Sequence, residues 1–171
     1  MRAAISSAIA IMLLSACSNT PTVTTDHSPT ATFSSYRSYM WIGKPDNMAP
    51  LMQQRMVDSV EEQLQKLGWT QSPNADVAIA AHAVLSQKQT LDTMYSGPAY
   101  RGWGWSGWGV GSSTTTVRTY NVGTLIIDMF DTKTRQGIWR GTASGTLTDS
   151  PESRSGRVHA GVEKMFEKFP E

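Results

Sequence analysis

Two stretches of the chain place apolar residues at the three- to four-residue spacing of an amphipathic helix. The first runs from Leu51 to Leu67 and is followed by Gly68, the residue type that commonly ends a helix. The second follows Ser150 and Pro151, a pair typical of a helix start. The two apolar stripes are Met52, Met56, Val60, Leu64 and Leu67, and Val158, Val162, Met165 and Phe169. We therefore predict two helices.

Four other stretches, 33–42, 77–89, 114–130 and 138–147, have the composition or the alternation of strands. In the second, one face carries Val77, Ile79, Ala81, Ala83 and Leu85. The element order β-α-β-β-β-α predicts an α/β two-layer sandwich, with a small mixed sheet of about four strands and both helices on one face. The first β-α-β unit allows a parallel pair of strands, whereas the later hairpin must be antiparallel.

The polar turn 131–137 sets the register of that hairpin. If it closes symmetrically, Phe130 lies opposite Ile138 and Asp128 lies opposite Arg140. We expect Asp128 and Arg140 to form a structural ion pair across the two strands. Exposed pairs of this kind contribute little to stability.

The N-terminus has the pattern of a secretion signal: a basic Arg2, a 12-residue stretch of apolar or small residues from Ala3 to Leu14, and a cysteine at position 17. The apolar stretch is too short to span a bilayer. Leu14-Ser-Ala-Cys17 resembles the lipobox of bacterial lipoproteins, which implies cleavage after residue 16 and acylation of Cys17. The alternative is an ordinary secretory signal that happens to contain a cysteine. Residues 17–32, rich in Thr, Ser and Pro, are then expected to form the lipidated residue and a flexible tether.

These features predict a protein held in the bacterial envelope by acylated Cys17. Ser18, which is not aspartate, is similar to an outer-membrane address and favours the periplasmic face of that membrane. Removal of residues 1–16 leaves 14 basic and 14 acidic side chains, so no net field attracts nucleic acid. The single cysteine excludes an internal disulfide.

A Gly/Trp-rich segment at about 92–114 has no core periodicity and is predicted to be a loop. Trp103, Trp105 and Trp108, with Arg101, are a candidate contact surface for a sugar, a lipid headgroup or a protein. The alternative is a loop that folds back on its own domain. The string Gly102 to Gly107 fits G-x-G-x-x-G, but no helix is predicted after it, so we expect no nucleotide site.

The sequence contains no recognisable set of catalytic residues. The serines lack a nucleophile motif, and the three scattered histidines lack the spacing of metal ligands. We therefore expect a non-enzymatic domain without cofactor or metal, which binds or organises an envelope partner. Two alternatives stay open. One is a glycan- or glycolipid-binding module that uses the tryptophans, and the other is a cell-wall hydrolase with two carboxylates roughly 5 to 10 Å apart in a cleft.

An ordered set of short motifs resembles one family of bacterial lipoproteins. The motifs are Tyr36-Arg-Ser-Tyr-Met-Trp41, Asn74-Ala-Asp76 before the strand that contains His82, Gly123-Thr-Leu-Ile-Ile-Asp128, and Ile138-Trp-Arg-Gly-Thr-Ala143. Together they are similar to the DUF4136 family, a domain of unknown function, from about residue 33 to 169. The resemblance implies a lipidated envelope domain over 33–171 and supplies no activity.

Overall fold

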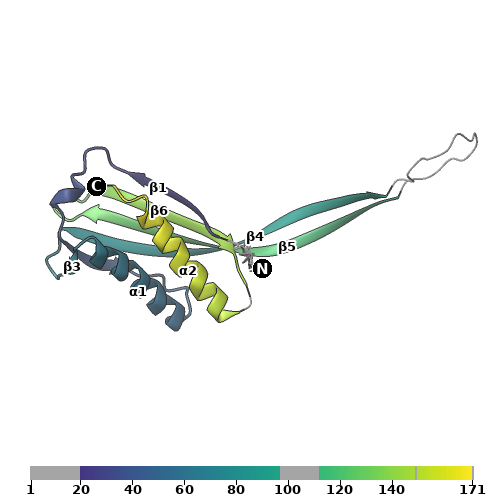
Figure 1. The fold of residues 1–171 in the computed structure, drawn as a ribbon, viewed down its shortest axis with the longest axis horizontal. Coiled ribbons are helices and arrows are strands. Elements are labelled where there is room, and N and C mark those ends of the chain that lie inside the picture. Colours follow the sequence, from purple (N-terminus) through teal and green to yellow (C-terminus); the bar gives the residue numbers. More distant parts are fainter. Residues whose placement is uncertain (1–19, 97–111, 149, 171) are drawn as a thin grey trace, which may run out of the picture.

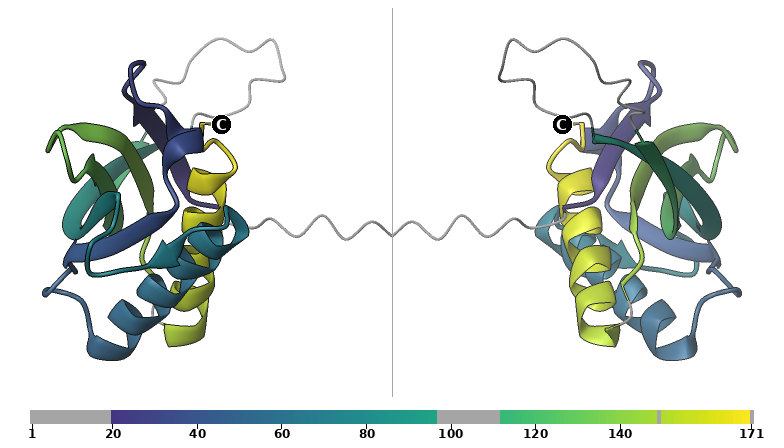
Figure 2. Two further views of the ribbon diagram at one scale, coloured as in Figure 1. Left: turned by 90° about the vertical axis from the view of Figure 1, so that its left-hand side faces the viewer. Right: turned by 90° about the vertical axis from the view of Figure 1, so that its right-hand side faces the viewer.

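The computed structural model describes residues 20–96, 112–148 and 150–170 (Figure 1). Its strands are β1 (Thr22–His27), β2 (Ser38–Gly43), β3 (Thr70–Gln71), β4 (Val77–Ser96), β5 (Ser112–Asp131) and β6 (Gly137–Thr146). Its helices are α1 (Pro50–Lys66), α2 (Pro151–Phe166) and the short 3-10 helix η1 (Phe33–Ser35). The side-on views of Figure 2 show α1 and α2 next to each other over one face of the sheet.

The strands form one mixed sheet in the order β1-β6-β5-β4-β2-β3. β2 is parallel to both of its neighbours, β3 and β4. The other neighbouring pairs, β4 with β5, β5 with β6 and β6 with β1, are antiparallel. The mixed α/β fold is thus confirmed, and so is the parallel pair of the first β-α-β unit. The prediction of about four strands was an undercount, because the sheet has six.

β1 lies in a segment that we predicted to be a flexible tether. That prediction is wrong for Thr22–His27, which pairs with β6 along its whole length. An edge strand that covers one face of the core needs apolar side chains on that face only, and in β1 the half-buried Val23 packs against the core. The β-branched threonines of this strand favour the extended backbone. The composition of the segment is polar because its other face is exposed, not because it lacks structure.

The strand predicted for 33–42 is shorter than expected. Residues 33–35 form η1, and β2 begins only at Ser38. The aromatic residues Phe33, Tyr36 and Tyr39 are all buried, and their spacing of three suits a turn better than the period of two in a strand. The aromatic content and the apparent alternation of the stretch predict a strand over its whole length, whereas the structure places only its second half in one.

The core lies between the helices and the sheet. The predicted helical stripes supply Met56, Val60, Leu64, Val162 and Met165, all fully buried. The sheet supplies alternate residues of β4 and β5, namely Val77, Ile79, Ala81, Leu125, Ile127 and Met129. α1 ends as predicted before Gly68, which has φ +77°. Ser150 caps α2, because its side chain accepts a hydrogen bond from the N–H of Ser153.

β4 and β5 form the longest element, a hairpin that projects from the body of the domain (Figure 1). The two 20-residue strands pair without a break from Val77 opposite Asp131 to Ser96 opposite Ser112. The loop predicted for 92–114 is therefore wrong at both ends, where strand continues for several residues. Residues 97–111 are outside the described part. No helix among the described residues has the length and apolar character needed to cross a membrane.

Candidate functional site

An apolar groove of about 480 Å³ lies at the base of the hairpin, between the sheet and the N-terminal ends of α1 and α2. We call it the arginine-rimmed groove. Its apolar wall includes Pro21, Leu51, Leu85, Leu125, Leu147 and Val158, and its three basic residues are Arg55, Arg154 and Arg157. The volume and the apolar lining are typical of ligand-binding sites.

The groove exists because the sheet is longer than the helices that cover it. Ile79 and Ala81 on β4 are buried under the helices, whereas Leu85 on the same face lies beyond them and is 66% exposed. Leu51, at the start of α1, is 70% exposed beside it. Core-type side chains therefore continue into solvent at this end of the molecule.

Gly123 shapes the floor of the groove. A Cβ atom at this position would lie 2.9 Å from Cδ2 of Leu147, so the missing side chain gives Leu147 its place over β5. Leu147 follows the end of β6 and remains 38% exposed. The groove is thus lined from segments that are far apart in the sequence.

Positive charge gathers at the same end. Two contacts show that α1 and α2 run parallel. Glu152 lies near Arg55 at the start of both helices, and further along both helices Nε2 of His159 lies 3.5 Å from Glu62. Their N-terminal ends therefore carry partial positive charges side by side. Glu152 is the acidic group near Arg55, and a hydrogen bond from Ser150 lowers its pKa.

A second pocket, of about 310 Å³, is polar and is lined by two carboxylates, Asp76 and Asp131, together with Tyr36 and Lys133. Asp131 accepts hydrogen bonds from the N–H groups of Lys133 and Thr134 at 2.8 and 2.7 Å and holds the turn after β5. Asp76 accepts hydrogen bonds from the N–H of Arg37 and the hydroxyl of Ser38.

These two acids do not have the electrostatics of a glycosidase pair. The pKa values of Asp76 and Asp131 are both lowered, mainly because each carboxylate accepts hydrogen bonds from backbone N–H groups. A glycosidase general acid needs a raised pKa, so that it holds a proton at working pH. The arrangement favours a structural role for both residues in tying β2 to the turn after β5.

Tyr36, which donates a 3.0 Å hydrogen bond from its hydroxyl to Oδ2 of Asp131, makes this cluster sensitive to alkaline pH. Burial, then that bond, raises the pKa of Tyr36 to about 12. A tyrosine in the unfolded chain ionises near pH 10, so its contribution to stability is complete below pH 10 and is lost as the pH rises towards 12.

We expect the free energy of unfolding, measured by urea titration, to fall over that window, and Tyr36→Phe to flatten the fall. Burial also raises the pKa of Tyr39. Part of the decrease in unfolding free energy with pH should therefore remain in the variant. The lost hydrogen bond should cost about 1 kcal/mol at neutral pH. An unchanged alkaline slope in Tyr36→Phe would contradict the assignment.

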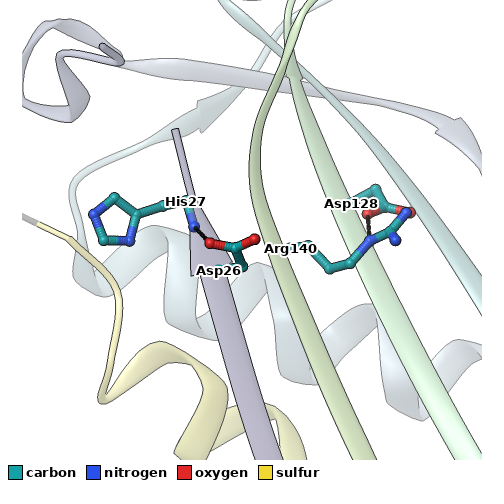
Figure 3. A network of polar contacts seen from close by, with 4 residues as sticks. All are labelled: Asp26, His27, Asp128 and Arg140. Atoms are coloured by element: carbon teal, nitrogen blue, oxygen red, sulfur yellow. Dashed lines mark hydrogen bonds and ion pairs between the residues drawn. The ribbon is translucent and has the colours of Figure 1, made fainter. Parts of the chain in front are cut away.

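The structure brings together Asp128 and Arg140 (Figure 3). They lie opposite each other on β5 and β6, with Nε and Nη2 of Arg140 at 2.5 and 3.0 Å from the two carboxylate oxygens. Asp128 is buried, whereas the Arg140 side chain is largely exposed. The hydrogen bond to Asp128, and then the charge of Asp26 on β1, raise the pKa of Arg140. The pair therefore helps to join three strands.

One detail of the predicted register was wrong. Phe130 lies opposite Gly137 rather than Ile138, because the ladder shifts by one residue between Met129 and Phe130. The irregularity sits next to the turn, beyond the ion pair, so it leaves Asp128 opposite Arg140. Counting outward from a turn assumes that no bulge intervenes.

The other predicted site residues are outside the described part of the chain: Cys17, Arg101, Trp103, Trp105 and Trp108. Among residues 20–96, 112–148 and 150–170, no cluster of three or more potential metal ligands is found. Sequence reasoning missed the arginine-rimmed groove. One signal was available, because Arg154 lies in the first turn of a helix, where acidic residues are usually preferred.

Comparison with known proteins adds the fold and the family. No curated protein sequence matches the chain. A PDZ domain protein from Parabacteroides distasonis ATCC 8503 superposes with a TM-score of 0.55 at 14% identity over 89% of this chain, which spans only 37% of that protein. A PelC dodecamer structure from Paraburkholderia phytofirmans gives 0.51 at 13% identity over 85% of this chain and 94% of the PelC chain.

At such identities these likenesses show a shared fold and nothing more. The family assignment comes from the sequence itself, which matches one family over 23–171, from within β1 to beyond α2. The chain belongs to the family described as Domain of unknown function (DUF4136).

Proposed function

We propose that this protein is a lipid-anchored component of the bacterial envelope whose domain acts by binding, with the arginine-rimmed groove as its binding site. The groove carries the proposal, because it combines an apolar wall, three guanidinium groups and about 480 Å³ of accessible space. The polar pocket supports binding over catalysis, since the carboxylates of Asp76 and Asp131 are engaged in structural hydrogen bonds, Asp76 at the start of β2 and Asp131 in the turn after β5.

The lipobox-like Leu14-Ser-Ala-Cys17 supports the anchor. Two or three acyl chains on one residue are enough for stable attachment, whereas one chain is not. Ser18 favours the outer membrane, and the domain would then face the periplasm. Only Ser18, Asn19 and Thr20 separate Cys17 from Pro21, which lines the groove.

The anchor is tested by mass spectrometry of the protein purified from membranes. We expect a chain that begins at Cys17 and carries diacylglyceryl and fatty acyl mass. Cys17→Ala should abolish both the cleavage and the added mass, whereas Ser18→Ala is the matched control and should keep them. A mature chain that begins elsewhere, or one without acyl mass, would refute the anchor.

The binding site is tested by placing a photoreactive side chain at Leu51, in the groove, or at Leu67, at the opposite end of α1. Both positions are exposed leucines, so neither replacement should disturb the core. After irradiation of intact cells, we expect adducts from position 51 and few from position 67. Equal adduct formation at the two positions would remove the groove as a binding site.

A further inference from the structure

We infer that the arginine-rimmed groove docks on the lipid surface to which the chain is anchored. In this arrangement Leu51 and Leu85 insert among acyl chains, and Arg55 with its neighbours contacts lipid phosphates. The inference rests on the proposed anchor at Cys17 and adds which face of the domain meets the bilayer.

The length of the connection places the groove near the membrane. Pro21 lines the groove and is four residues after Cys17. A fully extended chain of four residues reaches about 14 Å at most. A lipid-anchored Cys17 therefore keeps this end of the domain within that distance of the bilayer, at a high effective concentration of lipid.

The apolar character of this end matches such a surface. Three of the large hydrophobic side chains exposed in the described part of the chain line the groove: Leu51, Leu85 and Leu147. A contiguous apolar area with a polar rim is typical of a surface that contacts membranes or partners. At the opposite end of α1, the large exposed hydrophobic residue in the described ranges is Leu67, which is 42% exposed.

The charge is complementary to a lipid headgroup region. Three arginines and the N-terminal ends of two parallel helices meet here, and among the described residues Glu152 is an acid that lies near Arg55. Guanidinium groups bind phosphate oxygens in bidentate geometry, and helix N-termini attract anions. Basic residues next to an apolar area favour anionic bilayer surfaces, and this attraction weakens as salt increases.

The hairpin is compatible with this orientation. It projects from the body of the domain (Figure 1), and residues 83–85 of β4, at its base, line the groove. The exposed pair of Leu91 and Val117 lies on the same side of the β4–β5 ladder as Leu85. Docking of the groove would therefore bring the hairpin alongside the lipid surface.

The test uses the acylated full-length mature protein in vesicles of phosphatidylcholine, with or without phosphatidylglycerol. Cys17 is the only cysteine and its thiol is blocked by acylation, so Leu51→Cys or Leu67→Cys supplies a unique thiol for a polarity-sensitive fluorophore. In anionic vesicles we expect severalfold stronger quenching by spin-labelled lipid, and a blue-shifted emission, at position 51 compared with position 67. Omission of phosphatidylglycerol or addition of salt should reduce the difference.

Arg55→Glu, added to Leu51→Cys, should lower the quenching in anionic vesicles while the protein stays attached. Equal quenching at positions 51 and 67 in acylated, vesicle-bound protein would overturn the docking and leave the anchor standing. A photoadduct at Leu51 that is a peptide, together with absent quenching, would also overturn it. Absent acylation would instead refute the proposed function, and docking with it.

Discussion

Gly141→Ala is expected to destabilise the domain by about 2–3 kcal/mol, because the core has no space for the added methyl group. A Cβ atom on Gly141 would collide with the indole of Trp139 and lie 2.7 Å from Sδ of Met165. Both side chains are buried, and the indole is rigid, so neither can move aside without disturbing the packing between β6 and α2. For a domain of this size, the loss corresponds to a Tm lower by roughly 5–10 °C.

Gly145→Ala on the same strand is the matched control for this effect. Its Cβ would lie 3.9 Å or more from its nearest neighbours, an ordinary van der Waals distance. Thermal unfolding followed by circular dichroism should therefore show a nearly unchanged Tm for Gly145→Ala. Equal Tm values for the two variants would mean that Trp139 and Met165 do not pack over Gly141 as described.

The helices and the central strands could be predicted because their apolar residues follow the period of the element. In α1, the stripe of Met56, Val60 and Leu64 is fully buried, and in β5 Ile127 and Met129 alternate towards the helices. Burial against a second layer imposes these periods on the sequence. The Asp128 and Arg140 register could also be predicted, since it depends on counting across one local turn.

The edges of the sheet could not be predicted in this way. β1 buries part of only one face, and β3 has two residues, so neither produces a hydrophobic period. None of the described helices or strands covers the outer half of the hairpin as a second layer, and its pairing rests on backbone hydrogen bonds between strands. Cross-strand pairing without burial leaves little trace in the sequence.

The arginine-rimmed groove was invisible for another reason. Its wall comes from Pro21, Leu51, Leu85, Leu147 and Val158, which meet only after the sheet has formed. Leu51, Leu85, Leu147 and Val158 look locally like ordinary core residues, and Pro21 lies in a segment that looks like a tether. They form a groove because the helices are shorter than the sheet and leave one end of it uncovered. This difference in length can be seen only in the three-dimensional structure.

Phe169→Ala is expected to cost about 3 kcal/mol, because this residue closes the aromatic end of the core. We predicted Phe169 as part of the helical stripe, but α2 ends at Phe166. The chain then turns, with the N–H of Phe169 bonded to the carbonyl of Phe166. The ring lies between four others, at centroid distances of 5.2 Å from Phe33, 5.9 Å from Trp69, 5.4 Å from Trp139 and 5.5 Å from Phe166.

These four rings come from η1, the segment between α1 and β3, β6 and α2, so Phe169 joins four segments of the chain at this end. Loss of its ring removes apolar burial and four aromatic contacts at once, and near-ultraviolet circular dichroism should weaken along with a drop in the urea midpoint. Phe166→Ala is the informative comparison, because that ring contacts only Trp139 and Phe169 among the described aromatic residues and should cost less. If Phe166→Ala proves the more damaging change, then α2 itself, and not the turn that follows it, holds the aromatic end of the core together.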